Sequence, residues 1–329
     1  MIKPYSPCVV CDTNNRQIIS KIGRNFTKLT TVICTGCGLI HSHPIPSKPE
    51  LDKFYKDTYR KKYKQVFRPQ LRHTVRYSKG CLNIVREVLS YCNFINLKDK
   101  SFLDIGSGSG EVLYFAKKMG FKTLGIEPNT GYASFCQKDL ELNVQNTTLE
   151  NADLDKQKFD VINLNQVLEH LPNPIDTLNY LKKILNYDGV LVLTVPDILA
   201  NLHSPSTRFH YAHIYNYNHL NLKKLFDNVG FQILNPETNS TKIFAKKTKS
   251  PDNSQINFNL KKNYISVIES IKGSDYQRHY TTITPYKRFI KKCLIYPKEM
   301  IIGAYFRKHK KVLDREFLNF QSNSTSKSY

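Results

Sequence analysis

The sequence predicts an α/β protein built on a doubly wound, mostly parallel sheet. A short apolar run, Phe102–Ile105, is followed by the turn GSGSG and then by a stretch with apolar residues at helical spacing. A second apolar run ends at Glu127. A strand, a glycine turn, a helix and a second strand make the βαβ unit from which such sheets are assembled.

The remaining elements of the predicted sheet follow in chain order. The first helix covers 111–119, and Gly120 ends it, as glycine commonly does at a helix C-terminus. FDVINL and GVLVLTV are further buried strands, because both are short, continuous apolar runs. After Gly230, the segments FQIL and KIFAKK form a closing pair.

Charge is distributed unevenly along the 329 residues, whose net charge is +22. Residues 1–100 carry 19 Lys+Arg and 6 Asp+Glu (+13), residues 101–250 carry 15 of each, and residues 251–329 carry 15 and 6 (+9). Basic flanks around a neutral core favour an anionic partner, although a lysine-rich, soluble surface explains them equally well. We see no secretory signal and no membrane-spanning run, and therefore expect a cytoplasmic protein.

A glycine turn of this kind can hold a dinucleotide, a phosphate or an adenosyl cofactor. Glu127 is placed to accept hydrogen bonds from both hydroxyls of a ribose. The spacing is G-x-G-x-G, and Asp104 precedes the first glycine, where its carboxylate would repel a pyrophosphate but tolerate a cationic sulfonium. No Gly-Lys-Ser/Thr follows, which excludes a Walker loop. The turn therefore favours S-adenosylmethionine (SAM) over a tight turn without a ligand.

Five ordered motifs resemble the class I SAM-dependent methyltransferases over about residues 80–250: FLDIGSGSGEVL, GIEP, FDVINLNQVLEHLPNP, GVLVLTVP and HIYNYNHLNLKKLFDNVGF. This resemblance implies a seven-stranded sheet with a terminal antiparallel hairpin. It implies that Glu127 holds the ribose and Pro128 lies near the adenine. The full cofactor-binding set is Asp104, Gly106, Ser107, Gly108, Glu127, Pro128, Asn165 and Gln166.

Two C-x-x-C pairs near the N-terminus predict a structural Zn²⁺ site formed by Cys8, Cys11, Cys34 and Cys37. Four thiolates fill a tetrahedral shell, so no position stays open for catalysis. The alternative is four reduced cysteines without a metal. The cysteine pairs, CGLI and FYKDTY ahead of the glycine turn resemble zinc-containing methyltransferases that include sugar C-methyltransferases.

The acceptor implied by this narrower resemblance is a nucleotide- or lipid-linked sugar of surface-polysaccharide biosynthesis. Arg68, Arg72 and Arg76 recur every four residues and are expected to share one helical face that binds an anionic acceptor, with a solvated basic face as the alternative. Tyr55, Tyr59 and Tyr63 repeat at the same spacing and either cover the cofactor or pack.

Catalytic residues are expected in the segment RFHYAHIYNYNHLNL, which follows the fifth strand. The resemblance places a His and a Tyr at the acceptor, and we assign these to His213 and Tyr215, with His219 as a competing base. The alternative for each His is a packing or helix-capping role. An RNA methyltransferase is the alternative function, supported by the charge and the zinc module.

We divide the chain into a zinc-binding module (1–50), a helical lid or linker (51–100), a SAM-binding methyltransferase domain (101–250) and a basic, mainly helical C-terminal extension (251–329). In the extension, Phe289, Ile290, Cys293 and Leu294 form an apolar stripe flanked by lysines. This helix either contacts the inner face of an anionic membrane or packs on the core.

Overall fold

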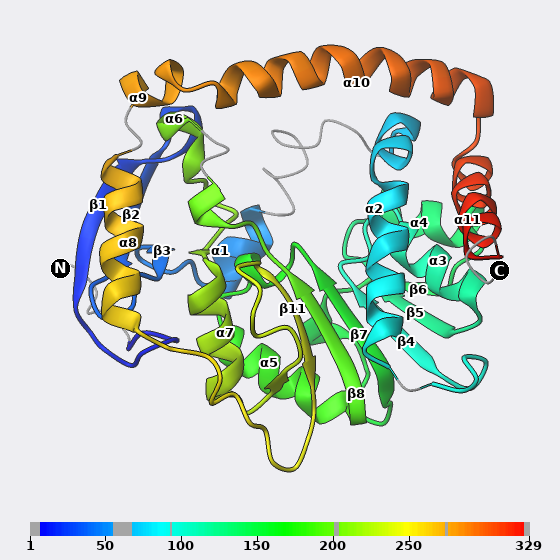
Figure 1. Ribbon diagram of the computed structural model, residues 1–329, viewed down its shortest axis with the longest axis horizontal. Helices are drawn as coiled ribbons and strands as arrows, with labels where there is room; N and C mark the ends of the chain where they lie inside the picture. Colours follow the sequence, from blue (N-terminus) through cyan, green and yellow to red (C-terminus); the bar gives the residue numbers. More distant parts are fainter. Residues whose placement is uncertain (1–6, 55–67, 93, 201–203, 274–275, 326–329) are drawn as a thin grey trace. The chain divides into compact units, whose positions relative to one another are not determined.

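The architecture comes from a computed structural model that describes residues 7–54, 68–92, 94–200, 204–273 and 276–325. Its seven-stranded sheet has the order β10-β11-β8-β7-β4-β5-β6 (Figure 1). The pairs β4–β5, β4–β7 and β5–β6 are parallel, and β10–β11 is antiparallel. The predicted fold class, the parallel sheet and its closing antiparallel pair are confirmed.

Strands β4, β5 and β7 agree closely with the predicted runs, because each run is apolar enough to be buried on both faces. Strand β8 begins four residues before the predicted run GVLVLTV, and β6 was not predicted. Their bounds, in sheet order, are β10 Gln232–Ile233, β11 Lys242–Lys246, β8 Leu185–Thr194, β7 Phe159–Asn165, β4 Ser101–Ile105, β5 Lys122–Ile126 and β6 Val144–Gln145.

Within the described residues, the chain forms two compact units that interleave in sequence. Unit 1 comprises 1–55, 166–183 and 193–290, and unit 2 comprises 56–165, 184–192 and 291–329. Each spatial unit therefore draws on segments from both ends of the chain.

Unit 2 contains the glycine turn and the helices around it. Helix α3, Glu111–Met119, has the predicted bounds and ends at Gly120, which has φ +109°. Helix α2, Leu71–Ser90, packs against α3 and against α11, His309–Thr325. Tyr114 donates a hydrogen bond to Asp314 Oδ1 (2.6 Å), so α11 is also fixed to α3 by a polar contact. Helix α4 spans Thr130–Asp139.

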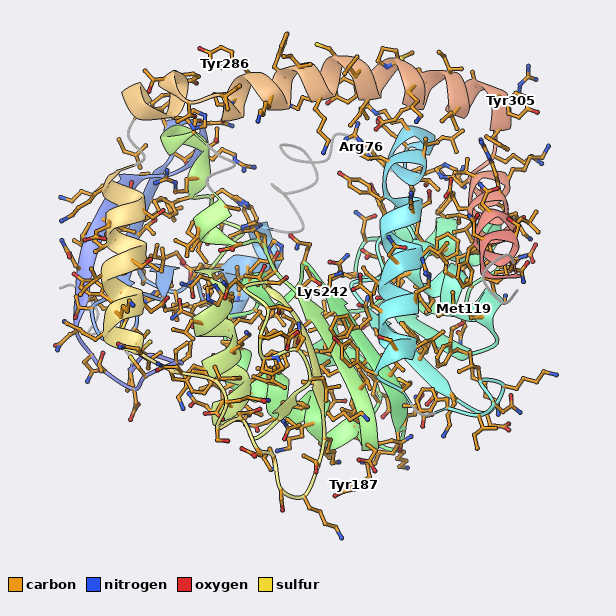
Figure 2. All side chains as sticks on the ribbon, viewed as in Figure 1. Arg76, Met119, Tyr187, Lys242, Tyr286 and Tyr305 are labelled. Atoms are coloured by element: carbon orange, nitrogen blue, oxygen red, sulfur yellow. The ribbon has the colours of Figure 1, made fainter. Side chains whose placement is uncertain are left out.

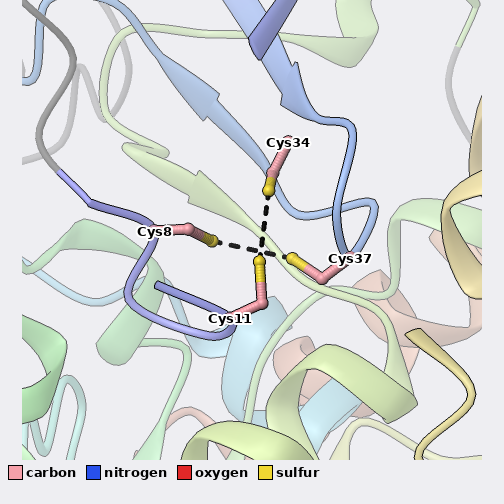
Figure 3. Close-up of side chains that lie close together, drawn as sticks. All are labelled: Cys8, Cys11, Cys34 and Cys37. Carbon is pink, nitrogen blue, oxygen red and sulfur yellow. Dashed lines mark hydrogen bonds between the residues drawn. The ribbon is translucent and has the colours of Figure 1, made fainter. Parts of the chain in front are cut away.

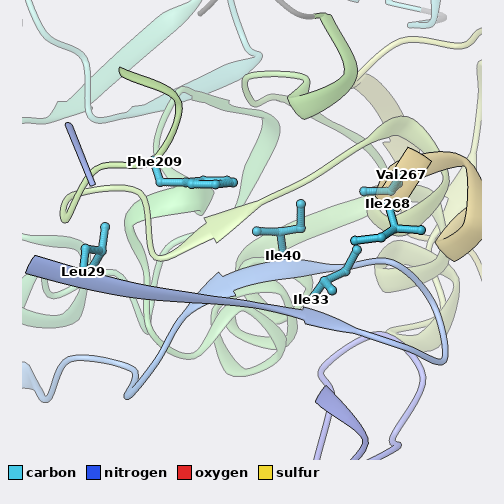
Figure 4. Packing of buried hydrophobic residues seen from close by; sticks show 6 residues of the cluster. All are labelled: Leu29, Ile33, Ile40, Phe209, Val267 and Ile268. Carbon is cyan, nitrogen blue, oxygen red and sulfur yellow. The ribbon is translucent and has the colours of Figure 1, made fainter. Parts of the chain in front are cut away.

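Unit 1 is built on a second sheet of order β1-β2-β3-β9, with bounds β1 Arg16–Ile22, β2 Lys28–Cys34, β3 Ile40–Ser42 and β9 Tyr215–Asn216. Its core includes Ile33, Ile40 and Val267, the last from helix α8, Leu260–Lys272 (Figure 4). The start of the C-terminal extension thus packs on the N-terminal module.

The other helices complete the list: α1 Lys48–Lys53, α5 Pro174–Ile184, α6 Pro205–Arg208, α7 His219–Asn228, α9 Tyr276–Thr281 and α10 Thr284–Phe306. Among the described residues, none of these helices is both long and apolar enough to cross a bilayer. Tyr55, Tyr59 and Tyr63, predicted as a cover for the cofactor, lie outside the described residues.

Candidate functional site

The glycine turn after β4 has the backbone that only glycine adopts readily. Gly106, Gly108 and Gly110 have φ values of +69°, +54° and +79°, in the left-handed region. A Cβ on Gly110 would come within 2.8 Å of Cys136 Sγ, so this position also needs glycine for close packing. The turn therefore brings backbone N–H groups to the carboxyl end of the parallel strands, where α/β sheets bind ligands.

Glu127 lies at the end of β5 and contacts this turn directly. Its Oε2 accepts a hydrogen bond from the Gly108 N–H (2.8 Å), and its Oε1 accepts one from the Asn129 N–H (2.7 Å). Each carboxylate oxygen has two lone pairs, so a carboxylate at this position can accept hydrogen bonds from more than one donor, as a ribose diol requires. The side chain is buried, which makes such a hydrogen bond stronger than it would be in water.

Asp104 is buried on β4, immediately before the glycines. Burial raises the pKa of its carboxyl to about 7, while the hydrogen bond from Asn163 Nδ2 (2.6 Å) acts in the opposite direction. A carboxyl that titrates near neutral pH becomes a full negative charge once a cation binds beside it. Asp104 is therefore suited to a cationic sulfonium.

Two further features of unit 2 fit an adenosyl cofactor. The Ser107 hydroxyl is buried and has no hydrogen-bond partner within the described chain. Gly108 has open space where a Cβ would lie, because its nearest neighbour there is the Gly106 carbonyl oxygen at 3.9 Å. A ligand bound in the space beside Gly108 could supply the hydrogen-bond partner that the Ser107 hydroxyl lacks within the described chain. Pro128 is exposed, next to Glu127.

The two amides predicted at the methionine end follow the β7 strand. Asn165 is its last residue, and Gln166 has φ +59°, a strained value for a residue with a side chain. The Gln166 N–H donates to the Thr194 carbonyl (2.8 Å), which fixes this turn. The cofactor contact predicted for both amides stays a prediction.

A cluster of histidines and one glutamate occupies unit 1. The His170 and His213 rings are 4.9 Å apart, and the His210 and His213 rings are 3.8 Å apart. Glu169 Oε1 lies 3.5 Å from His170 Nε2. Burial raises the pKa of Glu169 to about 8. His213, which the sequence predicts as a base, thus has titratable neighbours that the prediction did not include.

Glu169 and His170 were missed as site residues. Both are part of the motif FDVINLNQVLEHLPNP, in which only Asn165 and Gln166 had been singled out. The detectable signal was an adjacent Glu-His pair just past a strand that ends at the ligand side of the sheet. His213 is 43 residues further along the chain, so its pairing with them depends on tertiary structure.

The other two predicted catalytic residues, Tyr215 and His219, lie within a strand and a helix of unit 1. Tyr215 lies on β9, paired with His41 of β3, and its hydroxyl donates to the Pro172 carbonyl (3.2 Å). His219 is the first residue of helix α7, and burial lowers its pKa. The N-cap of α7 is Asn218, whose side chain accepts a hydrogen bond from the Asn221 N–H, so His219 does not cap this helix. Catalytic roles for Tyr215 and His219 stay predictions.

The four predicted metal-ligating cysteines converge in unit 1. Their sulfurs all lie within 4.8 Å of one another, with Cys8–Cys37 at 3.6 Å and Cys11–Cys34 at 3.4 Å (Figure 3). A tetrahedral ion with Zn–S bonds of about 2.3 Å holds its sulfurs roughly 3.8 Å apart. The residues therefore fit a zinc ion. Hydrogen bonds among the four sulfurs lower the pKa of Cys34 and Cys11 and raise the pKa of Cys8 and Cys37.

Two side-chain amides donate hydrogen bonds to the backbone of the second cysteine pair. Asn221 of α7 and Asn263 of α8 both donate to the Cys37 carbonyl (2.8 Å each). Gly36 gives space to this loop, because a Cβ there would lie 3.1 Å from Cys11 Sγ. Such outer contacts orient metal ligands, and here they come from the C-terminal half of the chain.

The predicted arginine face is only partly present. Helix α2 begins at Leu71, so Arg68 precedes it, and the expectation that all three arginines share one helical face is wrong for Arg68. Arg68 pairs with Asp139 (3.2 Å), and Arg76 makes a two-pronged ion pair with buried Glu299 (2.5 and 2.6 Å). Arg72 is exposed and contacts Gln70. The acceptor-binding role of the three stays a prediction.

Comparison with known proteins locates one domain. Residues 74–235 match the family described as a methyltransferase domain. The ubiquinone biosynthesis O-methyltransferase of Haemophilus ducreyi is 30% identical over 105 residues, covering 29% of this chain and 44% of that protein. That of Actinobacillus pleuropneumoniae is 31% identical over 102 residues, covering 28% and 44%. The chain thus spans less than half the length of these curated relatives.

Two solved structures are similar at low sequence identity. The plantazolicin methyltransferase BpumL in complex with SAH is 18% identical, with a TM-score of 0.44 over 56% of this chain and 77% of that one. Magnesium protoporphyrin IX methyltransferase (ChlM) from Synechocystis with bound SAM is 15% identical, with a TM-score of 0.43 over 62% and 97%.

The strand order, the glycine turn and the acidic strand end are the features that the sequence leads us to expect of a SAM-dependent methyltransferase. Residues 74–235 are the part of this chain that matches a methyltransferase domain. The relatives named above do not include a sugar methyltransferase, so the predicted sugar acceptor is considered below as a proposal.

Proposed function

We propose that this protein transfers a methyl group from SAM to an oxygen of a small acceptor. The observation that carries the proposal is the Glu169–His170–His213 group, whose ligand atoms lie within 4.8 Å of one another. It collects a carboxylate and two imidazoles, the side chains suited to binding a hydroxyl and to promoting the loss of its proton. The curated relatives, named as O-methyltransferases, support the choice of oxygen for the part of the chain that they match.

When bound, SAM supplies a methyl group already activated by its sulfonium. The chain's own residues have to hold the donor: Glu127 accepts the ribose hydroxyls, Gly108 leaves room for the ligand, and Asp104 provides negative charge. Little further chemistry is required of the protein, because alignment of donor and acceptor supplies most of the rate.

We also propose that Cys8, Cys11, Cys34 and Cys37 hold one structural Zn²⁺. Support comes from the sulfur separations and from the amide contacts of Asn221 and Asn263 on the same loop. Because α7 and α8 contact this loop, the ion would stabilise a unit built from both ends of the chain.

A nucleotide- or lipid-linked sugar is the second candidate acceptor. The N-terminal cysteine module favours it, through the resemblance to zinc-containing sugar methyltransferases. The arginines offer less support than the sequence indicated, because Arg68 and Arg76 are paired with carboxylates. RNA is a third acceptor class, supported by the net charge of +22.

The test is formation of S-adenosylhomocysteine with three acceptor panels: phenols and other hydroxylated small molecules, nucleotide-linked sugars, and mixed RNA. We expect turnover with the first panel and loss of turnover in Glu127→Ala. Methylation at oxygen is read by mass spectrometry of the product. Turnover confined to sugars at carbon, or to RNA, would replace the proposed acceptor while keeping the methyltransferase activity.

A further inference from the structure

Glu169 is a buried carboxyl group that the described chain leaves without hydrogen-bond partners. Its side chain is 1% exposed, and neither carboxylate oxygen has a hydrogen-bond partner within the described chain. Burying a carboxylate without partners is costly, so such a group is normally neutralised, paired or bound to a metal. The His170 ring lies beside it, at 3.5 Å from Glu169 Oε1 to His170 Nε2.

The tautomer of His170 is set by its surroundings. Nδ1 lies 2.7 Å from the Ala212 carbonyl oxygen, which can only accept, so Nδ1 carries the hydrogen. In the neutral ring, Nε2 then presents its lone pair toward Glu169. A metal-ligating histidine commonly has one ring nitrogen held by a backbone carbonyl, which fixes the tautomer and the orientation of the ring.

His213 completes the group. Glu169 and His170 lie on the short 3₁₀ segment Leu168–His170, and Ala212, which holds His170, is the neighbour of His213 in the chain. The ligand atoms of the three residues lie within 4.8 Å of one another. Metal–nitrogen and metal–oxygen bonds of about 2.0–2.2 Å place ligand atoms roughly 3–4 Å apart, so small side-chain movements would close the group on an ion.

We propose that Glu169, His170 and His213 form a binding site for a divalent transition-metal ion. Two imidazoles and one carboxylate suit Zn²⁺, Co²⁺ or Fe²⁺, whereas Ca²⁺ and Mg²⁺ require mostly oxygen ligands. This site differs from the four-cysteine cluster, which fills its own tetrahedral shell. Three protein ligands leave coordination positions for water or for an oxygen of a substrate.

The role of the ion rests on the proposed function. An acceptor hydroxyl whose oxygen binds the ion has a lowered pKa, because the positive charge stabilises the deprotonated oxygen. Its proton leaves to water, and the oxygen lone pair forms the new bond to the methyl carbon. The electrons of the broken carbon–sulfur bond stay on sulfur, so charge and atoms balance.

The experiment titrates Co²⁺ into protein whose cysteine cluster already holds zinc, without SAM or acceptor. Visible absorption reports the geometry of bound Co²⁺, and thiolate charge-transfer bands reveal any exchange into the cysteine cluster. We expect one equivalent bound without thiolate bands, and affinity lower by at least about tenfold in Glu169→Gln and His213→Ala, as loss of a ligand requires. His279→Ala, outside the cluster, is the matched control.

The melting temperature, measured with and without metal, distinguishes a lost metal site from a variant that is misfolded. Bound metal should raise the melting temperature of the wild type but not that of Glu169→Gln, since only the native site binds the ion. Absence of Co²⁺ uptake by the wild type, or equal uptake by both variants, would overturn the site. Metal binding without methylation of any oxygen acceptor would instead overturn the proposed function and leave the site intact.

A separate observation concerns helix α10, Thr284–Phe306. Its apolar side chains are unusually exposed: Phe289 (68%), Leu294 (71%), Met300 (70%), Ile301 (70%) and Tyr305 (80%). At 100° per residue, these positions and Ile290 fall on one side of the helix. Figure 2 shows Tyr305 near the end of this helix, projecting away from the ribbon.

Lysines border the same stripe. Lys287, Lys291 and Lys298 are exposed and lie along one edge of the apolar face by helical spacing. The opposite side carries Glu299, which is buried and paired with Arg76. The helix is therefore held on one side and displays an apolar stripe with a cationic border on the other, the pattern of helices that lie in a membrane interface.

We infer that α10 binds the surface of an anionic membrane, with its apolar stripe inserted among the acyl chains and its lysines at the headgroups. The lysine border favours an anionic lipid surface over an uncharged one.

The test is co-sedimentation with phosphatidylcholine vesicles, with and without phosphatidylglycerol. We expect binding only when phosphatidylglycerol is present, weaker binding at high salt, and loss of binding in Leu294→Glu/Ile301→Glu. Ile95→Glu, a substitution at another exposed isoleucine, is the matched control. If the wild type forms dimers without vesicles and the double variant is a monomer, the stripe contacts a second copy of the chain, and the inference is overturned.

Discussion

Gly108 and Glu127, nineteen residues apart, are joined by a hydrogen bond from the Gly108 N–H to Glu127 Oε2 (2.8 Å). The contact connects the turn after β4 with the end of β5, the two strand ends that border the cofactor side of unit 2. Glu127 also accepts from Asn129, the N-cap of helix α4. The carboxylate that is proposed to hold the ribose is thus fixed before the ligand arrives, which lowers the entropy cost of binding.

Glu127→Ala should weaken SAM binding strongly, because it removes an acceptor for the ribose and releases the turn. Charge-assisted hydrogen bonds contribute about 1.5–3 kcal/mol, so the Kd should rise roughly 10- to 150-fold. Calorimetric titration with SAM measures this Kd. The Kd of Glu127→Gln, which keeps one acceptor oxygen, should lie between those of the wild type and Glu127→Ala. Equal affinities for wild type and the alanine variant would remove Glu127 from the cofactor site.

The raised pKa of Asp104, about 7, predicts that SAM affinity depends on pH. The cationic sulfonium favours the ionised carboxyl, so binding below pH 7 must first release its proton. Affinity should therefore fall as pH decreases below 7, by at most about tenfold per unit, and level off above it. Calorimetry in buffers of different ionisation enthalpy should detect proton release that Asp104→Asn abolishes. A flat profile for the wild type would contradict this role.

Removing the proposed zinc should loosen unit 1. Cys34→Ser is expected to lose about one equivalent of zinc per chain, measured by elemental analysis, and to expose β2 and the contacting helices α7 and α8 to protease. Cys293→Ser, at an exposed cysteine on α10, should keep both metal and protease resistance. Wild-type protein that contains no zinc yet resists protease would show that the cysteines pack without an ion.

Much of unit 2 could be predicted from sequence because its signals are local. The strand Phe102–Ile105, the glycine turn and Gly120 each act on neighbouring residues, and all appear as predicted. The convergence of Cys8 and Cys11 with the second cysteine pair was equally accessible, since C-x-x-C spacing already places two ligands together.

What the sequence could not provide depends on long-range pairing. Glu169 and His170 become notable only when His213 folds back beside them, and Tyr215 turns out to extend the sheet of the N-terminal module. The arginine pattern misled for the same reason. Periodicity cannot reveal where a helix begins, and it cannot reveal that a carboxylate from the far end of the chain neutralises one of its residues.

That carboxylate, Glu299, gives the last prediction. Arg76 donates two hydrogen bonds to it, and the glutamate side chain is only 3% exposed. Arg76→Ala leaves a buried charge unpaired and should lower the free energy of unfolding by about 3 kcal/mol. Replacing both partners, in Arg76→Met/Glu299→Leu, should recover most of the loss, because no charge is then left in the apolar surroundings.

Arg72→Ala, at an exposed arginine, should change stability by less than about 0.5 kcal/mol. Urea denaturation measures all three. If an anionic acceptor uses this helix, Arg72→Ala raises its KM without changing SAM affinity. A stability loss in Arg72→Ala as large as that in Arg76→Ala would mean that the ion pair is not what fixes α10 to α2.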